Sequence, residues 1–349
     1  MKPIIAAIAT AVALTMGSAF SQTKVRIGLA TPITPLQSYY TYGKQLGFYD
    51  EEGLAPEFIA VAGGSILLPQ LASKAIDFAG INPDLPAIAL DKGEPYPVRF
   101  VFNVYTTQLF EFVVLDDSPV KTLADLKGRK IGVGALSWSN LPLSRAMLQD
   151  AGVNWSSEVQ VLPVGVGPAA WGRLTGNSID ALNLWNSQHE LLALTGVKIR
   201  RLPTPPKFKT LFSNGFATHE DTIRDKPELV EKFGRILAKS LYACKANIEG
   251  CVKSFWAHDP ASRPPPEKEA AWVAQYVAAG QLELDAALGA VDAARWGNYD
   301  ADTWKRLLAV MAEGGQIKRA DLPLDKLYTT RFVEGFNKWD RAAVARKAK

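Results

Sequence analysis

Stretches with the pattern of β-strands alternate with stretches of helical spacing along most of this chain. The first such unit runs from residue 25 to 65 and comprises a strand, a loop rich in Thr and Pro, a helix closed by Gly47, a second strand and the turn Gly63-Gly64-Ser65. Strands that alternate with helices are typical of βαβ units around a parallel sheet. In such sheets ligands bind beyond the carboxyl ends of the strands, where loops and helix N-termini meet. The alternation therefore predicts an α/β fold with its binding site at those loops.

The alternation falls into two runs, which predict two halves of similar construction. In the first run we expect strands at 24–29, 57–62, 76–79 and 98–105, and helices at 36–46, after a cap at Ser65 and at 85–92. In the second we expect strands at 130–133, 159–164, 179–184 and 197–202, and helices at 141–151 and 168–174. Extended segments at 110–115 and 211–218 are expected to cross between the halves. Helices follow, one behind an Asp225 cap and Pro227 and one at 267–279, and the basic end at 341–349 is expected to be a solvated terminus.

Length and composition agree with two packed lobes. At 349 residues the chain is too long for one ordinary core and has the length of two domains. It is 48% hydrophobic and 21% charged, which is typical of a globular protein. The net charge of +4 is too small to indicate nucleic-acid binding, and no basic run with interleaved aromatic residues occurs.

Residues 1–21 have the layout of a secretory signal peptide. Lys2 is the only charge, residues 4–16 form an apolar run too short to cross a membrane, and Gly17-Ser18-Ala19 offers small residues for cleavage. No cysteine stands directly after this run, and no later segment is apolar enough to span a bilayer. We therefore expect a soluble protein exported to the periplasm.

Cys244 and Cys251 are the two cysteines of the chain. They are separated by a helix break around 247–250, and in an oxidising compartment a disulfide could join the two helices. The alternative is a pair of buried free thiols on successive helical turns.

An ordered set of motifs resembles the periplasmic solute-binding proteins of ABC importers. Within them the chain is most similar to the group that binds thiamine precursors (NMT1/THI5-like), taurine, alkanesulfonates and nitrate. The motifs are Gly47-Phe48-Tyr49, Glu52-Gly53-Leu54, Gly63-Gly64-Ser65, and the segments 75–78, 123–132, 179–181, 225–230 and 245–247. Together they cover the chain from about residue 24 to the low 260s.

The resemblance implies two α/β sandwich lobes joined by two crossing strands, with the ligand in the cleft and closure about the hinge. Lobe one would comprise residues 24–110 and 217–349, including extra C-terminal helices, and lobe two residues 111–216. The implied partners are a small-molecule solute and an ABC permease in the inner membrane, with the binding protein itself a monomer. A sensor domain that delivers its closed form to a membrane kinase would use the same closure, and the sequence does not separate the two roles.

The loops expected to line the cleft contain no lysine and no arginine. These loops are 31–39, 62–65, 81–85, 105–108, 134–140, 164–168 and 184–188. A bidentate arginine clamp on a carboxylate is therefore not expected, unless Arg145 or Arg173 reaches in from a helix.

Aromatic and neutral polar residues are instead frequent in these loops. Large flat side chains stack on planar ligands, and Trp138 and Trp185 stand among polar residues just past strand ends. Tyr40 and Tyr42 are interpreted as ordinary helix packing. The candidate ligand-binding residues are Gln37, Ser38, Tyr39, Gly63, Gly64, Ser65, Asn82, Asp84, Tyr105, Thr106, Ser137, Trp138, Ser139, Asn140, Trp185 and Asn186. The polar members could equally be caps or turn residues.

The sequence favours a planar heteroaromatic or aromatic solute and leaves an anion as the alternative. Ser65 and Asn140 stand where helix N-termini would aim free N–H groups into the cleft, which could hold a sulfonate, carboxylate or nitrate. Asp84 would suit a ligand that donates hydrogen bonds or carries positive charge, or it is simply a turn residue after Pro83.

An enzymatic role is the alternative of another class, because the resemblance extends to fungal enzymes that make the thiamine pyrimidine. Those enzymes use a cysteine-rich iron-binding motif and an active-site histidine. Here the cysteines lie in the C-terminal helices, and His189, His219 and His258 lie outside the cleft loops of lobe one. No nucleophile elbow, metal-ligand cluster or phosphate loop occurs. We therefore expect no enzyme, no cofactor and no metal.

Overall fold

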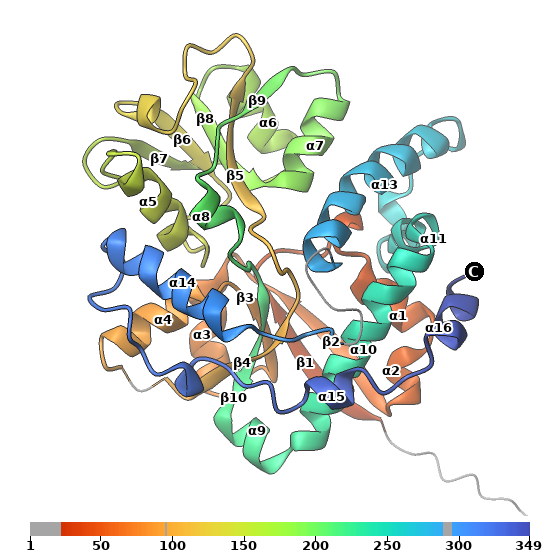
Figure 1. The fold of residues 1–349 in the computed structure, drawn as a ribbon. Coiled ribbons are helices and arrows are strands. Elements are labelled where there is room, and N and C mark those ends of the chain that lie inside the picture. The colour runs from red at the N-terminus through yellow and green to blue at the C-terminus, as the bar shows by residue number, and fades with distance from the viewer. Residues whose placement is uncertain (1–21, 95, 289–294) are drawn as a thin grey trace, which may run out of the picture.

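The computed structural model describes residues 22–94, 96–288 and 295–349, and the predicted signal peptide lies outside them. Figure 1 shows two lobes, each built on a five-stranded sheet that helices cover. Within the described residues no helix combines the length and the apolar character needed to cross a bilayer. The two-lobed α/β fold expected from the sequence is confirmed.

Both sheets are mixed rather than parallel throughout. The first has the order β2 (Leu54–Ala60), β1 (Thr23–Leu29), β3 (Phe78–Ile81), β10 (Gly215–His219) and β4 (Val98–Asn103). The second has the order β7 (Gln160–Pro163), β6 (Lys130–Val133), β8 (Ala181–Trp185), β5 (Phe110–Leu115) and β9 (Ile199–Arg201). The expected parallel pairing holds for β1 with β2 and β3, and for β6 with β7 and β8. β10 and β5 are each antiparallel to both of their neighbours.

The reversed strands are those that the chain enters after crossing between lobes. It crosses first through residues 104–109, from β4 to β5, and returns through 202–214, from β9 to β10, so that the expected crossing segments 110–115 and 211–218 lie wholly or partly within the sheets. Phe110 at the start of β5 pairs with Trp185 at the end of β8, and Gly215 at the start of β10 pairs with Ile81 at the end of β3. The carboxyl ends of the parallel strands and the amino ends of the reversed strands therefore meet between the two sheets.

Helices fill the remaining connections. Those of the first half are η1 (Pro35–Gln37), α1 (Tyr39–Gln45), α2 (Phe48–Glu51), α3 (Gly64–Ala72) and α4 (Asp84–Asp91). Those between β6 and β10 are α5 (Leu141–Asp150), α6 (Pro168–Thr175), α7 (Asn186–Leu194) and α8 (Pro206–Lys209). The C-terminal helices are α9 (Glu220–Asp225), α10 (Pro227–Ala246), α11 (Ile248–Lys253), α12 (Phe255–His258), α13 (Pro266–Leu288), α14 (Ala301–Glu313), α15 (Val333–Phe336) and α16 (Arg341–Ala348).

Three local expectations are corrected by the structure. Ser65 does not cap α3; the helix begins at Gly64 behind Gly63, whose φ of 113° a residue with a side chain rarely adopts. Asp225 is the last residue of α9 rather than the cap of α10. The expected helix 36–46 is divided at Ser38, where the chain turns from η1 into α1.

The C-terminal helix α16 packs against the rest of the protein, whereas we expected a solvated terminus. Val344 and Ala348 of α16 are buried, and Ala348 O accepts hydrogen bonds from Tyr42 Oη at 2.5 Å and from Asn247 Nδ2 at 2.7 Å. Asn247 stands between α10 and α11, which the Cys244–Cys251 disulfide joins with its Cα atoms 5.0 Å apart. The last helix thereby holds the α10–α11 corner against α1.

Two C-terminal helices also reach the second lobe. α13 lies against α7 on one side of the molecule, and α14 contacts α5 and α8 on the other (Figure 1). Lys207 of α8 pairs with Glu313 of α14 at 2.8 Å and with Asp150 of α5 at 2.6 Å. The lobes are thus in contact on both sides of the crossing segments.

Candidate functional site

A cavity lies where the strand ends of the two sheets meet. Its lining comes from β1, the η1–α1 segment, the crossing segments, the start of α5 and the helix α13. The lining residues are Leu29, Ala30, Thr31, Pro32, Ile33, Gln37, Tyr39, Tyr40, Gly80, Asn82, Val104, Tyr105, Leu109, Phe110, Trp138, Ser139, Asn140, Trp185, Asn214, Gly215, Phe216 and Glu283.

Aromatic rings from both lobes form the walls of this cavity. The indoles of Trp138 and Trp185 lie 5.8 Å apart between centroids, and the ring of Phe110 is 6.0 Å from Trp138 and 6.3 Å from Trp185. Tyr39 and Tyr40, from the first lobe, pack with their ring centroids 4.2 Å apart. Burial of these two phenols raises their pKa well above the usual tyrosine range, so both are neutral at physiological pH.

The position of Trp138 depends on Gly134, which precedes it in the β6–α5 loop. A Cβ atom at Gly134 would overlap the indole ring of Trp138. Only glycine therefore lets the indole pack this closely against the chain just after β6.

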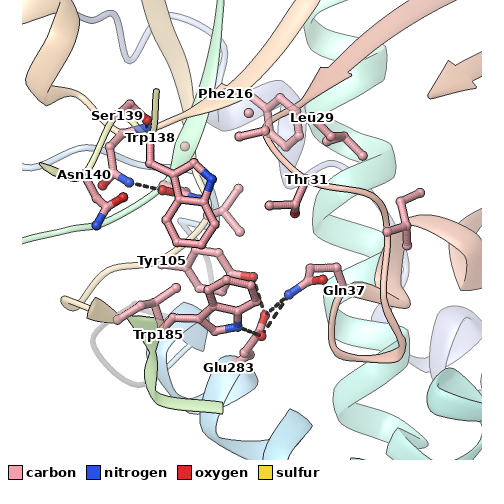
Figure 2. A pocket seen from close by; sticks show the side chains of 18 of the residues that line it. Leu29, Thr31, Gln37, Tyr105, Trp138, Ser139, Asn140, Trp185, Phe216 and Glu283 are labelled. Carbon is pink, nitrogen blue, oxygen red and sulfur yellow. Dashed lines mark hydrogen bonds between the residues drawn. The ribbon is translucent and has the colours of Figure 1, made fainter. Parts of the chain in front are cut away.

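Glu283 of α13 is a buried carboxylate in this neutral lining, with 3% of the residue exposed. Its oxygen Oε1 accepts hydrogen bonds from Gln37 Nε2 at 2.9 Å, Trp185 Nε1 at 3.0 Å and Ser187 Oγ at 2.7 Å. Tyr105 Oη donates to Oε2 at 2.7 Å (Figure 2). Burial raises the pKa of Glu283, and these donors act against the rise. The carboxylate thus ties η1, the first crossing segment, the end of β8 and the start of α7 to α13.

Polar groups on the other side of the cavity come from loops at the strand ends. Asn82 Nδ2 donates to Asn214 Oδ1, and Asn82 N donates to Ser139 Oγ at 3.0 Å. Asn140 is 2% exposed, and its Nδ2 is buried without a hydrogen-bond partner among the described residues. This amide is a free donor at the cavity wall.

Half of the residues that the sequence singles out lie in the lining. Glycines and hydroxyls of the loops account for most of the others. Those that line the cavity are Gln37, Tyr39, Asn82, Tyr105, Trp138, Ser139, Asn140 and Trp185. Those that do not are Ser38, Gly63, Gly64, Ser65, Asp84, Thr106, Ser137 and Asn186.

The residues outside the lining form contacts within the protein. Ser38 Oγ donates to Pro35 O, and Thr106 Oγ1 donates to Ala286 O. Asn186 Oδ1 accepts from the backbone of Ser187.

The remaining members of that set join the two lobes at the edge of the cavity. Ser65 N donates to Ser137 O at 3.1 Å, and Ser137 Oγ donates to Ala62 O. Asp84 Oδ2 accepts from Leu143 N at 2.9 Å. The Gly63-Gly64-Ser65 turn therefore lies in close contact with the Ser137 loop of the other lobe.

These contacts each occupy one backbone donor at the N-terminus of a helix that could face an anion. The first turn of α5 gives its Leu143 N–H to Asp84, and α3 gives its Ser65 N–H to Ser137. No lysine, arginine or histidine is among the residues that line the cavity in the described chain. Arg145 instead lies over the ring of Trp155 at 5.7 Å, and Arg173 is also outside the lining.

Glu283 is the main site residue that the sequence did not single out. It stands on the buried side of α13, with Ala279, Gly280 and Ala287 one turn away on either side. A lone carboxylate within a stripe of small buried residues is the signal that would have found it. Asn214, just before β10, and Phe216, near its start, were also missed. β10 is a reversed strand and therefore presents its amino end to the cavity, whereas we expected site residues at carboxyl ends.

The described residues contain no group of histidine, cysteine or acidic side chains that could hold a metal ion. Both cysteines are in the α10–α11 disulfide.

Comparisons with known proteins agree with the fold and the motifs. A sequence profile described as NMT1/THI5 like matches residues 36–249. A protein of Haemophilus influenzae named for thiamine biosynthesis is 26% identical over 152 residues, which are 41% of this chain and 48% of that protein. The match thus spans about half the length of that relative.

Solved structures resemble nearly the whole chain. A protein of Bordetella bronchiseptica has a TM-score of 0.73 at 19% identity and covers 91% of this chain and 98% of its own. The alkanesulfonate-binding protein SsuA of Xanthomonas axonopodis pv. citri, bound to MOPS, has a TM-score of 0.64 at 18% identity, with 88% and 99% covered. The desulfurization enzyme DszB has a TM-score of 0.54 at 16% identity, with 90% and 99% covered. Because the profile match extends over residues 36–249, more than half of the sequence, the chain belongs to the NMT1/THI5 like family.

Proposed function

We propose that this protein is the periplasmic solute-binding component of an ABC importer and binds a small planar aromatic or heteroaromatic solute between its lobes. The lobes would comprise residues 24–110 with 217–349, and residues 111–216. The observation that carries the proposal is the cavity itself, with aromatic walls from both sheets and no basic residue in its lining. Solved structures of the same fold include the ligand-binding component of an ABC-type import system and a periplasmic sulfonate-binding protein named for an ABC transporter, which supports the transport role.

Closure of the lobes would couple binding to delivery. The indole of Trp138 comes from the β6–α5 loop and that of Trp185 from the end of β8, whereas Tyr39 and Tyr105 come from α1 and the first crossing segment. A solute that touches both sets gains all its contacts only when the lobes are together, so its binding shifts the population toward closure. Asn140 Nδ2, which has no partner, would donate to an acceptor on the solute.

The anion and enzyme alternatives have less support. A sulfonate or nitrate would need donors that Asp84 and Ser137 already occupy. For a catalytic role, the described lining residues include no cysteine and no histidine, and the one carboxyl group among them, Glu283, is occupied by four neutral hydrogen-bond donors.

A ligand screen that compares heteroaromatic or amide-bearing solutes with small anions tests the proposal. In a thermal-shift assay heteroaromatic or amide-bearing solutes should stabilise the protein more than nitrate or short alkanesulfonates do. Native mass spectrometry of the purified protein should find a bound organic solute. Stabilisation by taurine or an alkanesulfonate alone would contradict the planar-solute proposal.

Tryptophan variants test the aromatic walls. Trp138→Ala and Trp185→Ala should each weaken solute binding by at least about tenfold, equivalent to roughly 1.4 kcal/mol, because a stacking face is lost. Unfolding should stay cooperative in both. Trp155→Ala is the matched control, since Trp155 lies in the same lobe beneath Arg145 and outside the cavity. Unchanged affinity in both cavity variants would remove the aromatic walls from the binding site.

A further inference from the structure

Among the described residues, the cavity lining contains one acidic side chain, Glu283, and no basic one. Glu283 makes no ion pair with any described residue, and its four hydrogen-bond donors, Gln37, Tyr105, Trp185 and Ser187, are all neutral side chains. Buried carboxylates are normally paired with a cation, because an isolated buried charge is costly. The partner that would balance Glu283 is therefore absent from the described chain.

The donors around Glu283 favour its ionised form. Gln37 Nε2 and Trp185 Nε1 can only donate, and both point at Oε1. A proton on this oxygen would set donor against donor, whereas a carboxylate accepts them all. Figure 2 shows Gln37, Tyr105 and Trp185 converging on the carboxylate at one end of the cavity.

The aromatic walls add to the same electrostatic preference. The faces of aromatic rings carry partial negative charge and attract cations, most strongly where water is excluded. Trp138 and Trp185 are 7% and 6% exposed, so their faces lie in a largely dry site. In such a site the interaction between a ligand charge and Glu283 is screened much less than in water.

We propose that the planar solute of this cavity is an organic cation, whose positive charge balances Glu283 while its flat body lies against the indoles of Trp138 and Trp185. This inference rests on the proposed binding function and specifies the charge of its solute. The carboxylate already accepts several hydrogen bonds, so it acts mainly through its charge, and the rings supply the direct contact.

Three ligands that share the same aromatic ring and differ in net charge test the inference. The probes are 1-methylnicotinamide, nicotinamide and nicotinate, which carry one positive, no and one negative charge. Isothermal titration and thermal shift at low and high salt should show the cation binding about tenfold or more tighter than the neutral amide, and nicotinate binding least. Glu283→Gln should reduce the ratio of cation to neutral affinity to near one. Asp285→Asn on the same helix makes the same change of net charge at an exposed residue and should leave the ratio as it is.

The outcomes separate this inference from the function it rests on. If nicotinamide binds as tightly as the methylated cation, or if no cation binds at millimolar concentration, the cationic solute is excluded while a neutral planar solute remains. If only sulfonates bind, both proposals fail.

A second readout needs no ligand: the ligand-free Glu283→Gln variant should be at least as resistant to thermal unfolding as the wild type, because it no longer buries an unbalanced charge. A preference for cations that survives in Glu283→Gln would assign the selectivity to the rings alone and overturn the role of Glu283.

Discussion

Asp84 lies at the first turn of α4 and closes the N-terminal turn of α5 in the other lobe. It is fully buried; Oδ2 accepts the Leu143 N–H, and Oδ1 has no partner among the described residues. Burial raises the pKa of this carboxyl to about 7, against the lowering effect of the backbone donors. The side chain thus fills a helix N-terminus that could otherwise have received an anionic ligand.

This raised pKa predicts how stability depends on pH. The folded protein holds the Asp84 proton more tightly than the unfolded chain does, so the free energy of unfolding falls as pH rises from about 4 through about 7. A rise from 3.8 to about 7 corresponds, at about 1.4 kcal/mol per unit, to a cost on the order of 4 kcal/mol at pH 8. Asp84→Asn keeps an acceptor for Leu143 N and removes the charge. Urea unfolding should find this variant more stable than the wild type at pH 8 and similar to it at pH 4; equal stability at both pH values would contradict the raised pKa.

At the scale of elements, the strand ends were predictable and the sides of helices were not. Trp138 and Trp185 could be placed in the site because each follows a strand whose carboxyl end had to face the cleft. Glu283 could not, because its place depends on how α13 packs against α7 after more than 60 residues of C-terminal helices. Gly63-Gly64-Ser65 has the composition of a ligand loop, and its close contact with the loop of Ser137 could not be predicted because that loop belongs to the other lobe. The reversed direction of β5 and β10 could not be predicted either. It follows from the crossings between the lobes and not from the residues of these two strands.

The α10–α11 corner carries a prediction of its own. The Cys244–Cys251 disulfide closes a short loop of sequence separation 7, for which chain entropy gives about 2 to 3 kcal/mol of stabilisation. The double variant Cys244→Ala/Cys251→Ala should lose about this much in urea unfolding, since the corner that holds α16 is then free to open. Reductant should destabilise the wild type by a similar amount and leave the double variant unaffected. If reductant lowers the stability of both proteins equally, its effect does not act through this bond.

At the scale of the whole molecule, the two lobes meet along one edge through small residues. Gly64 lies against Ser139, and Asn82 N reaches Ser139 Oγ at 3.0 Å beside it. These contacts join α3 and β3 of the first lobe to the β6–α5 loop of the second. They exist only while the lobes are together, so they should form when the cleft closes.

Gly64→Ala should therefore separate folding from closure. A Cβ atom at Gly64 would come within 2.6 Å of Cβ and Oγ of Ser139, so the lobes could not approach to their present distance. The backbone at Gly64 is helical and accepts alanine, and ligand-free stability should be unchanged. Solute affinity should fall by about tenfold or more, since closure then costs at least roughly 1.4 kcal/mol. Small-angle scattering should show that solute contracts the wild type and not the variant.

Gly172→Ala in α6, where nothing lies within 4 Å of the new methyl group, is the matched control and should bind as the wild type does. If Gly64→Ala binds the solute with wild-type affinity and contracts as fully, contact along this edge is not required for binding.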